Sequence, residues 1–419
     1  MEAVLNITGG PVSGTIRAHG AKNSVLPILA ATLLGKGVSI ISNCPDLTDV
    51  HATLKILCHL GCKAEYDGGI VTVDSSSVTR SDIPESLMRE MRSSVIFLGA
   101  ILARTGQAEM SHPGGCELGT RPIDLHLSAL QSLGAETFEV SGIIKCKAKR
   151  LYGNEIILSF PSVGATENIM LAACAADGVT IIKNAAREPE IEDLQSFLTA
   201  MGAKIDGAGT STIRVSGSKE KLRGAAHRIL PDRIETATYL CAAAMAGGKI
   251  RIEDVVPEHN AAVLSALSEA GCSITAESGA IELARYKPLR PMHPIRTMPY
   301  PGFPTDAQSP VMAVCTRAEG TTVFTENIFE SRFRHVGELA RMGADIRVEG
   351  RVAIVSGVGK LSGTRVKCTD LRGGAALMVA AMGAEGVTSI TDLRHIDRGY
   401  ERPEEVLEQL GIKAERIEM

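Results

Sequence analysis

The sequence lacks the segments that direct proteins into or across membranes. Its opening stretch, MEAVLNITGG, has no basic n-region and no apolar h-region, so we expect no secretory signal. The longest apolar runs, such as residues 25–34, stop at about ten residues, which is too short to span a bilayer. The net charge of −4 offers no excess of positive charge to nucleic acid or to an anionic membrane. We therefore expect a cytoplasmic protein with neither nucleic acid nor a membrane as a partner.

Common metal and phosphate motifs are also missing. The ten cysteines include no CxxC pair, so neither a zinc ribbon nor a redox dithiol is indicated. Cys58 and Cys62 have His51 and His59 nearby, but their helical spacing and apolar neighbours favour buried packing over metal binding. The chain contains no GxxxxGK[ST] loop, no strand-linked GxGxxG and no GxSxG elbow. The sequence therefore predicts no metal site.

A short phrase ending in glycine recurs along the chain. At 419 residues the chain is too long for one compact core, so two domains are expected. The phrase, such as LGC or MGA, recurs at intervals of 68 to 73 residues, and its glycines are Gly61, Gly134, Gly202, Gly271, Gly343 and Gly411. Each follows an amphipathic pattern, as a glycine that ends a helix does. Six internal repeats are therefore predicted.

Each repeat shows the same order of predicted elements. An Ala-rich helix that is apolar on all sides comes first, followed by a short β-branched strand, a polar loop, an amphipathic helix and closing strands. The unit is thus α-β-α-β-β, and the Ala-rich helices should be buried beneath outer sheets. Three units would form one α/β domain.

The residues that lead into the buried helices carry an unusual amount of charge. They are Lys22, Arg92, Gly164, Arg233, Asp306 and Arg372 in repeats one to six. Helix starts have free N–H groups and partial positive charge. If the helices are parallel, their starts converge and the four cations create a site for a highly anionic ligand.

The second repeat carries a long glycine-rich loop. The extra residues are HPGGCELGTR at 112–121, and such an extension of a structural repeat predicts a functional loop. Cys116 lies in it, with Arg121 five residues on. Nearby positive charge lowers a thiol pKa and makes the thiol reactive. Either acid catalysis or covalent attack would suit this residue.

Asp306 is the lone acidic residue among the six helix starts. An anion among cations is either part of a neutralising ion pair or a general base, and the residues alone leave both open. Arg332 and Arg398 lie in the polar loops of repeats five and six and would add positive charge to the same cleft.

Taken in order, these residues resemble a known family, the UDP-N-acetylglucosamine 1-carboxyvinyltransferases. The resemblance spans essentially the whole chain, and its cysteine-loop motif is highly specific. The matching segments are GAKN at 20–23, MRSS at 91–94, PGGCELGTRPIDLH at 113–126, SVGAT at 162–166, NAAREPEI at 184–191, LPDRIET at 230–236, FPTD at 303–306, FESRFRHV at 329–336 and HIDRGYER at 395–402.

The resemblance implies a fold and a reaction. The fold is the enolpyruvyl transferase fold, a two-domain inside-out α/β barrel with the active site in the cleft between the domains. We expect residues 21–229 to form the first domain, and residues 1–20 plus 230–419 the second. The enolpyruvyl group of phosphoenolpyruvate moves to the 3′-hydroxyl of UDP-N-acetylglucosamine by addition and elimination, releasing phosphate. This is the first committed step of peptidoglycan synthesis, and we expect a monomer that needs no cofactor.

The resemblance also assigns roles to residues. Cys116 is the proton donor, can form a covalent adduct and is the fosfomycin target, while Asp306 is the base. Phosphoenolpyruvate is bound by Lys22, Asn23, Arg92, Arg121, Arg372 and Arg398, of which Lys22 and Arg398 also act in catalysis. UDP-N-acetylglucosamine is bound by Asn23, Arg92, Arg121, Pro122, Ile123, Asp124, Leu125, Ser162, Val163, Gly164, Asp306 and Ile328. Arg332 and Asp370 support the site.

Two other functions compete with this one. A 5-enolpyruvylshikimate-3-phosphate synthase would share the fold and the donor, but we know of no such cysteine loop in that family. A non-catalytic UDP-sugar-binding relative would need a lost catalytic residue, whereas Cys116, Asp306 and the cations are all present.

Overall fold

The computed structural model describes residues 3–112, 123–218 and 222–418, and these divide into two compact units. The 20–230 unit contains residues 20–112, 123–218 and 222–230. The 231–418 unit also contains residues 3–19. The chain therefore passes from one unit to the other at residues 19–20 and again at 230–231.

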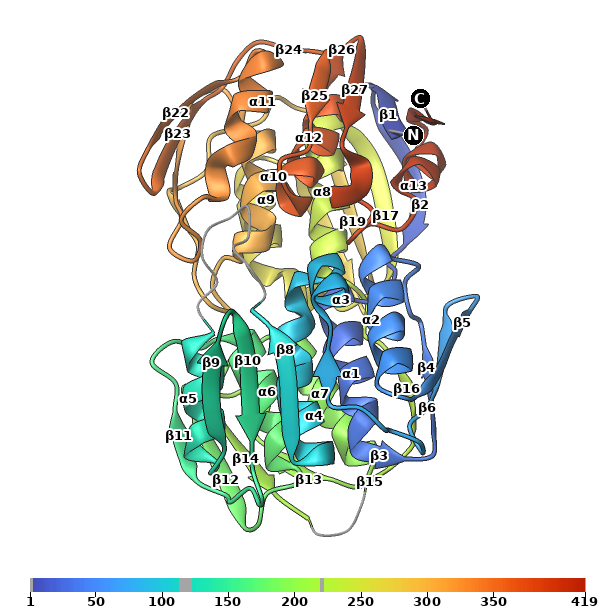
Figure 1. Ribbon diagram of the computed structural model, residues 1–419. Coiled ribbons are helices and arrows are strands. Elements are labelled where there is room, and N and C mark those ends of the chain that lie inside the picture. Colours follow the sequence, from blue (N-terminus) through green and yellow to red (C-terminus); the bar gives the residue numbers. More distant parts are fainter. Residues whose placement is uncertain (1–2, 113–122, 219–221, 419) are drawn as a thin grey trace. The chain divides into compact units, whose positions relative to one another are not determined.

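Three buried helices form the centre of each unit. In the 231–418 unit they pack against one another beneath the sheets (Figure 1). They are α1 (Lys22–Ala31), α4 (Phe97–Thr105) and α6 (Val163–Ala173) in the 20–230 unit, and α8 (Arg233–Ala246), α10 (Thr305–Cys315) and α12 (Leu371–Met382) in the other. In α12 every residue after Leu371 is buried, because alanine and glycine let neighbouring helices approach on all sides. The buried, Ala-rich character predicted for these helices is confirmed.

The second helix of each repeat is amphipathic and ends at the recurring glycine. These helices are α2 (Thr48–His59), α5 (Asp124–Ser132), α7 (Pro189–Ala200), α9 (Ala261–Glu269), α11 (Val336–Arg341) and α13 (Pro403–Gln409). All six glycines of the recurring phrase have φ between +79° and +104°. Glycine adopts this left-handed region without a steric penalty, which explains why the same residue recurs at each helix end.

Four-stranded sheets lie outside the helices, one for each repeat within the described residues. The strand that each of these sheets receives from the segment after its buried helix is β4 (Val38–Ser42), β8 (Gln107–Ser111), β12 (Val179–Lys183), β17 (Gly248–Val255), β21 (Thr321–Thr325) or β27 (Val387–Thr391). The two-residue strands β3 (Gly35–Lys36) and β26 (Ala384–Glu385) come just before β4 and β27 and belong to separate two-stranded sheets. The closing hairpins of repeats one to five are β5 (Lys63–Asp67) with β6 (Ile70–Asp74), β9 (Glu136–Val140) with β10 (Ile143–Lys147), β13 (Lys204–Asp206) with β14 (Thr212–Ser216), β18 (Ser273–Glu277) with β19 (Gly279–Arg285), and β22 (Asp345–Glu349) with β23 (Val352–Ser356).

Each sheet contains one further strand that the sequence analysis missed. It precedes a buried helix and pairs in parallel with the strand that follows a buried helix. These strands are β2 (Val12–Arg17), β7 (Asp82–Ile83), β11 (Glu155–Ile157), β16 (Ala226–Arg228), β20 (Ile295–Arg296) and β25 (Arg365–Lys367). Five of the six have only two or three residues, too few to produce an alternating pattern in the sequence.

Two of these strands pair outside their own repeat. β2 leads into α1, yet it pairs with β17 of the fourth repeat. β16 leads into α8, yet it pairs with β4 of the first repeat. Each connection between the units therefore begins at a strand that is anchored in the unit the chain is leaving.

The sixth repeat is completed by the beginning of the chain. Its sheet has the order β25-β27-β1-β28, where β1 is Ala3–Thr8 and β28 is Lys413–Glu418. β1 pairs antiparallel with both neighbours, which is the position that the second closing strand has in the other repeats. The final repeat thus borrows its missing strand from the N-terminal segment.

One prediction about cysteine packing is half wrong. Cys62 is buried, but Cys58 is exposed on the outer side of α2. His51 and His59 pair with Asp46 and Asp82 instead of with the thiols. Among the described residues no group of three or more His, Cys, Asp or Glu side chains could hold a metal ion. No described helix has the length and apolar character needed to cross a membrane.

The borrowed strand predicts that the N-terminal segment stabilises the 231–418 unit. Ile7, near the end of β1, is fully buried, whereas Ile417 on the adjacent β28 is 39% exposed. Ile7→Ala should lower the free energy of unfolding by about 2–5 kcal/mol, because it removes a fully buried side chain. Ile417→Ala is the matched control and should cost less than about 1 kcal/mol. Equal losses in urea unfolding would contradict this role of β1.

Candidate active site

The structure places all six predicted helix-start residues in the first turn of a helix. Lys22 and Arg233 are the first residues of α1 and α8, and Arg92 begins the 3₁₀ turn η2 (Arg92–Ile96) that leads into α4. Gly164, Asp306 and Arg372 are the second residues of α6, α10 and α12. At the starts of α1, α8, α10 and α12 a charged residue therefore lies in the turn that carries the free N–H groups.

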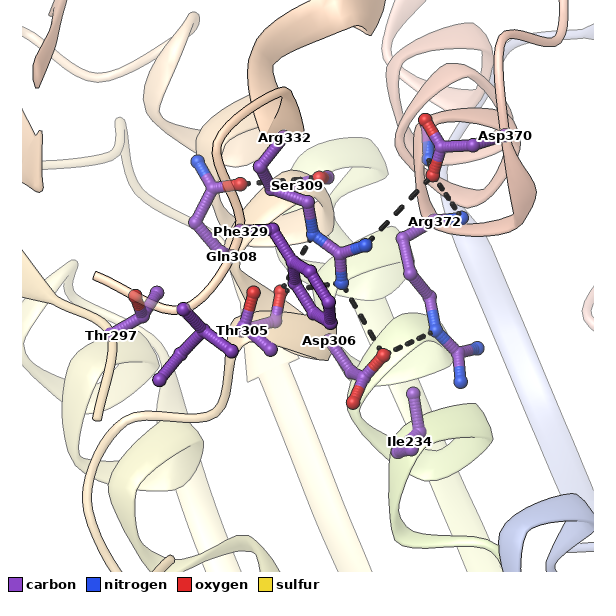
Figure 2. A network of polar contacts seen from close by, with 12 residues as sticks. Ile234, Thr297, Thr305, Asp306, Gln308, Ser309, Phe329, Arg332, Asp370 and Arg372 are labelled. Atoms are coloured by element: carbon purple, nitrogen blue, oxygen red, sulfur yellow. Dashed lines mark hydrogen bonds and ion pairs between the residues drawn. The ribbon is translucent and has the colours of Figure 1, made fainter. Parts of the chain in front are cut away.

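In the 231–418 unit these helix starts converge on the carboxylate of Asp306 (Figure 2). Its Oδ1 atom accepts hydrogen bonds from Nε of Arg372 at 2.9 Å and from Nη2 of Arg332 at 3.3 Å. The guanidinium of Arg332 is 2% exposed and also donates to the carbonyl oxygen of Thr305. Asp306 thus takes part in an ion pair, one of the two alternatives that the sequence left open.

Asp370 organises the start of the neighbouring helix. Its Oδ1 atom accepts hydrogen bonds from the backbone N–H groups of Arg372 and Gly373, so it is the N-cap of α12. The Nη1 atom of Arg332 lies 4.0 Å from the same oxygen. Arg332 therefore spans the starts of α10 and α12 and balances a carboxylate at each.

Tyr400 holds the other end of Arg372. The Nη1 atom of Arg372 donates to the Tyr400 hydroxyl at 3.4 Å, and that oxygen lies 2.8 Å from the hydroxyl of Thr238 in α8. The Tyr400 ring is buried and lies beneath the guanidinium. Arg398, two residues earlier in the same segment, is half-buried. The HIDRGYER segment therefore positions Arg372 through Tyr400.

The charges around Asp306 decide its ionisation. Burial alone would raise the pKa of its carboxyl, but Arg372, Arg332 and Arg233 oppose this and hold the pKa well below its usual range. The carboxylate is consequently ionised at any physiological pH. Its second oxygen, Oδ2, has no hydrogen-bond partner among the described residues, and the side chain is 29% exposed. The arrangement fixes one oxygen and leaves the other to accept a proton or a hydrogen bond.

In the 20–230 unit, Lys22 is buried at a helix start where a cation is unfavourable. Its Nζ atom lies 2.7 Å from Oδ2 of Asp49, in the first turn of α2, and both side chains are nearly inaccessible. Asp49 offsets the repulsion between the ammonium group and the positive end of α1. Asn23 follows at partial exposure, and Ser24 hydrogen-bonds to the buried Asp193 of α7.

Two predicted nucleotide-binding segments meet through His126. Ser162 caps α6 by accepting a hydrogen bond from the Ala165 N–H, and Val163 and Gly164 begin the helix. Ile123, Asp124 and Leu125 form the start of α5. A Cβ atom on Gly164 would lie 3.0 Å from Cε1 of His126, so a larger residue would require the imidazole ring to shift by a few tenths of an ångström. The two segments therefore lie side by side at two adjacent helix starts.

Asn168 fixes the tautomer of His126. Its amide nitrogen donates to Nδ1 of His126 at 2.8 Å and to the carbonyl oxygen of Val95, while its oxygen accepts from the Gly99 N–H. Nδ1 is therefore the acceptor, and the ring proton sits on Nε2, near Gly164. Burial lowers the pKa of His126 to about 4, so the ring is neutral.

The remaining predicted residues are placed as follows. Ile328 is half-buried in the loop after β21, where its N–H donates to Glu326. Cys116, Arg121 and Pro122 lie outside the described residues, as does the side chain of Arg92. The structure thus brings Asp306, Arg332, Asp370 and Arg372 together in one unit, and residues 123–125 and 162–164 together in the other.

Sequence reasoning missed several residues that hold these groups in place. Asp49, His126, Asn168, Glu326 and Tyr400 had no assigned role. His126 and Tyr400 stand inside the quoted motifs PIDLH and HIDRGYER, which was the available signal. Asp49 and Glu326 gave none, because an isolated acidic residue in a polar loop resembles any solvated charge.

Comparison with solved structures defines the class of protein. The enolpyruvyl transferase NikO from Streptomyces tendae superimposes with a TM-score of 0.89 at 27% identity and 99% coverage of both chains. An EPSP synthase from Acinetobacter baumannii, 19% identical, shares the fold with a TM-score of 0.74. The predicted enolpyruvyl transferase fold is confirmed.

Sequence comparison is more specific. A model of the family EPSP synthase (3-phosphoshikimate 1-carboxyvinyltransferase) matches residues 7–407. UDP-N-acetylglucosamine 1-carboxyvinyltransferase 2 of Caldanaerobacter subterraneus subsp. tengcongensis is 52% identical, covering 98% of this chain and 99% of the relative. UDP-N-acetylglucosamine 1-carboxyvinyltransferase 1 of Carboxydothermus hydrogenoformans is 47% identical, covering 100% and 99%. The chain belongs to the enolpyruvyl transferases, and within them to the UDP-N-acetylglucosamine 1-carboxyvinyltransferase family.

Two buried neutral histidines predict a loss of stability in mild acid. Burial lowers the pKa of both His126 and His335 to about 4, below the ordinary value of 6.5. Between these values the unfolded chain binds more protons than the folded one, so stability falls as pH decreases from about 6.5 to 4. His126→Gln should be less stable than wild type at pH 7 but lose less on acidification to pH 4.5. An identical acid-induced fall in melting temperature would contradict this.

Proposed function

We propose that this chain transfers the enolpyruvyl group of phosphoenolpyruvate to the 3′-hydroxyl of UDP-N-acetylglucosamine and releases phosphate. The observation that carries the proposal is identity of 47–52% with carboxyvinyltransferases of that name over 97–100% of this chain. The ionised Asp306 at the convergence of helix starts is in keeping with it. We further propose a cytoplasmic, monomeric enzyme that needs no cofactor and catalyses the first committed step of peptidoglycan synthesis.

The donor would be held by cations from both units. Phosphoenolpyruvate carries a phosphate and a carboxylate, and Lys22, Arg92, Arg121, Arg372 and Arg398 are the residues we assign to them. Cations at helix starts suit such a ligand, because the helix N–H groups and the side chains attract the same negative charge. The active site would then be the cleft between the units.

The proposed chemistry is an addition followed by an elimination. The thiol of Cys116 gives its proton to the methylene carbon of phosphoenolpyruvate, and the 3′-hydroxyl oxygen bonds to the adjacent carbon. Asp306 takes the proton that the hydroxyl loses. In the elimination a proton passes from the new methyl group back to the Cys116 thiolate, and the carbon–oxygen bond to phosphate breaks as the double bond forms again. The proton that Asp306 had taken goes to the departing phosphate. Phosphate departs, so the atoms balance without a redox partner.

The geometry of Asp306 suits the part of base in this scheme. Arg372 and Arg332 fix Oδ1, which leaves Oδ2 to receive the hydroxyl proton. A carboxylate with so low a pKa is a weak base in isolation. The Asp306 carboxylate can still accept the hydroxyl proton while the hydroxyl oxygen bonds to a carbon that has just gained positive character. The O–H group becomes strongly acidic as that bond forms.

The acceptor assignment predicts which substrate supports turnover. Purified protein should release phosphate from phosphoenolpyruvate with UDP-N-acetylglucosamine and not with 3-phosphoshikimate. Cys116→Ala should abolish this release while UDP-N-acetylglucosamine still binds in calorimetry, and fosfomycin should modify wild type at Cys116 alone. Cys58→Ala removes an exposed thiol and is the matched control, with unchanged turnover and inactivation. Undiminished turnover of Cys116→Ala, or release with 3-phosphoshikimate, would overturn the assignment.

Asp306→Asn tests the proposed base. Asparagine keeps the shape of the side chain but cannot take a proton, so kcat should fall about 10²- to 10⁴-fold. Binding of UDP-N-acetylglucosamine, followed by calorimetry, should survive and show that the site remains formed. A kcat within about threefold of wild type would remove Asp306 from the acid–base chemistry.

A further inference from the structure

Glu326 is a buried carboxylate with an unusual set of partners. Its side chain is 1% exposed. Oε1 accepts hydrogen bonds from the N–H groups of Ile328 and Phe329 at 2.8 and 3.0 Å and from the Thr297 hydroxyl at 3.0 Å. Oε2 accepts from the Thr305 hydroxyl at 3.0 Å. All four donors are neutral, so the carboxylate is satisfied by hydrogen bonds instead of a counter-charge.

Three of these partners, Thr305, Ile328 and Phe329, belong to two segments with different parts in the proposed reaction. Thr305 precedes Asp306, the proposed base, at the start of α10. Ile328 is a residue that the family resemblance assigns to the acceptor sugar nucleotide. One rigid carboxylate therefore connects the residue beside the base with the loop that contacts the acceptor.

Thr305 is held on its other side as well. Its carbonyl oxygen accepts hydrogen bonds from Nη2 of Arg332 at 2.9 Å and from Nε at 3.3 Å. Its hydroxyl and its carbonyl oxygen are thus held by two different side chains, and Figure 2 shows Thr305 between Thr297 and Arg332. This double attachment leaves the peptide that carries Asp306 little freedom to rotate.

We propose that Glu326 is a positioning residue that sets the place of the Asp306 carboxylate relative to the loop that contacts the acceptor. The proposal rests on the function proposed above. Glu326 touches no reacting atom in this account, since it acts through Thr305 on the base and through the Ile328 N–H on the loop. Because both segments serve the acceptor and neither carries a residue assigned to phosphoenolpyruvate alone, the effect should fall on the acceptor side of the kinetics.

Thr305→Val tests this connection at its simplest point. The change keeps the branched shape of the side chain and removes only the hydrogen bond to Glu326. We expect kcat/KM for UDP-N-acetylglucosamine to fall about tenfold, while KM for phosphoenolpyruvate stays within about twofold. Thr305→Ser restores the hydroxyl and should recover activity to within about threefold of wild type. Glu326→Asp, whose shorter carboxylate cannot reach both segments, should show the same split as Thr305→Val.

A matched control separates positioning from simple loss of stability. Thr322 is a buried threonine of β21 in the same unit, and its hydroxyl accepts one hydrogen bond from the Met292 N–H. Thr322→Val should lower the melting temperature and leave the kinetic constants within about twofold of wild type.

Two outcomes would overturn the proposal. Either Thr305→Val has wild-type constants, or its KM for phosphoenolpyruvate rises by the same factor as its KM for UDP-N-acetylglucosamine. Failure of the wild-type protein to release phosphate with UDP-N-acetylglucosamine would instead refute the proposed function, and it would be seen before any variant is made.

Discussion

The structure depends on keeping charged side chains ionised at the buried starts of its central helices. A cation at a helix start opposes the helix dipole, and burial adds a desolvation cost. The protein meets this with specific carboxylates, Asp49 beside Lys22 and Asp306 beside Arg372. The balance differs between the two units. Two arginines, Arg372 and Arg332, stabilise the ionised form of Asp306 through Oδ1. Among the described residues its other oxygen, Oδ2, has no hydrogen-bond partner.

This arrangement explains why the repeat suits the proposed chemistry. Each repeat contributes one helix start, so a six-fold repeat supplies six equivalent positions beside free N–H groups, and five of them carry a charged residue. The positions are alike in backbone and differ in side chain. Glycine at 164 allows His126 to approach, Asp306 provides the proposed base, and the others contribute cations. In our proposal the long loop with Cys116 then adds an acid that no other repeat carries.

The fold was accessible from the sequence where a signal repeats. The glycine phrase revealed six copies because each glycine needs a left-handed conformation that other residues adopt only at a cost. The Ala-rich helices could be predicted to be buried because they have no polar face. Short strands such as β7 and β20 could not be predicted, because two residues are too few to show an alternating apolar pattern. The residue patterns also gave no sign of the exchange of β2 and β16, since strand pairing depends on contacts far apart in the chain. Only the family resemblance led us to expect residues 1–20 in the second domain.

The site was predictable in its charges but not in the groups that hold them. Lys22, Asp306 and Arg372 occupy equivalent positions in their repeats, and this equivalence alone identified them as candidate site residues before the structure was known. Asp49 lies in the first turn of α2 and Glu326 directly after β21, and both become meaningful only once the fold brings them against the start of a buried helix. The predicted role of each residue came from the family resemblance. Residue type and position alone left Asp306 as either an ion-pair partner or a base.

The most direct test of the central claim is the identity of the product. Protein incubated with phosphoenolpyruvate and UDP-N-acetylglucosamine should yield a sugar nucleotide heavier by one enolpyruvyl group in mass spectrometry. NMR should place that group on the 3′-oxygen. An unmodified sugar nucleotide, or a group attached at another oxygen, would contradict the account.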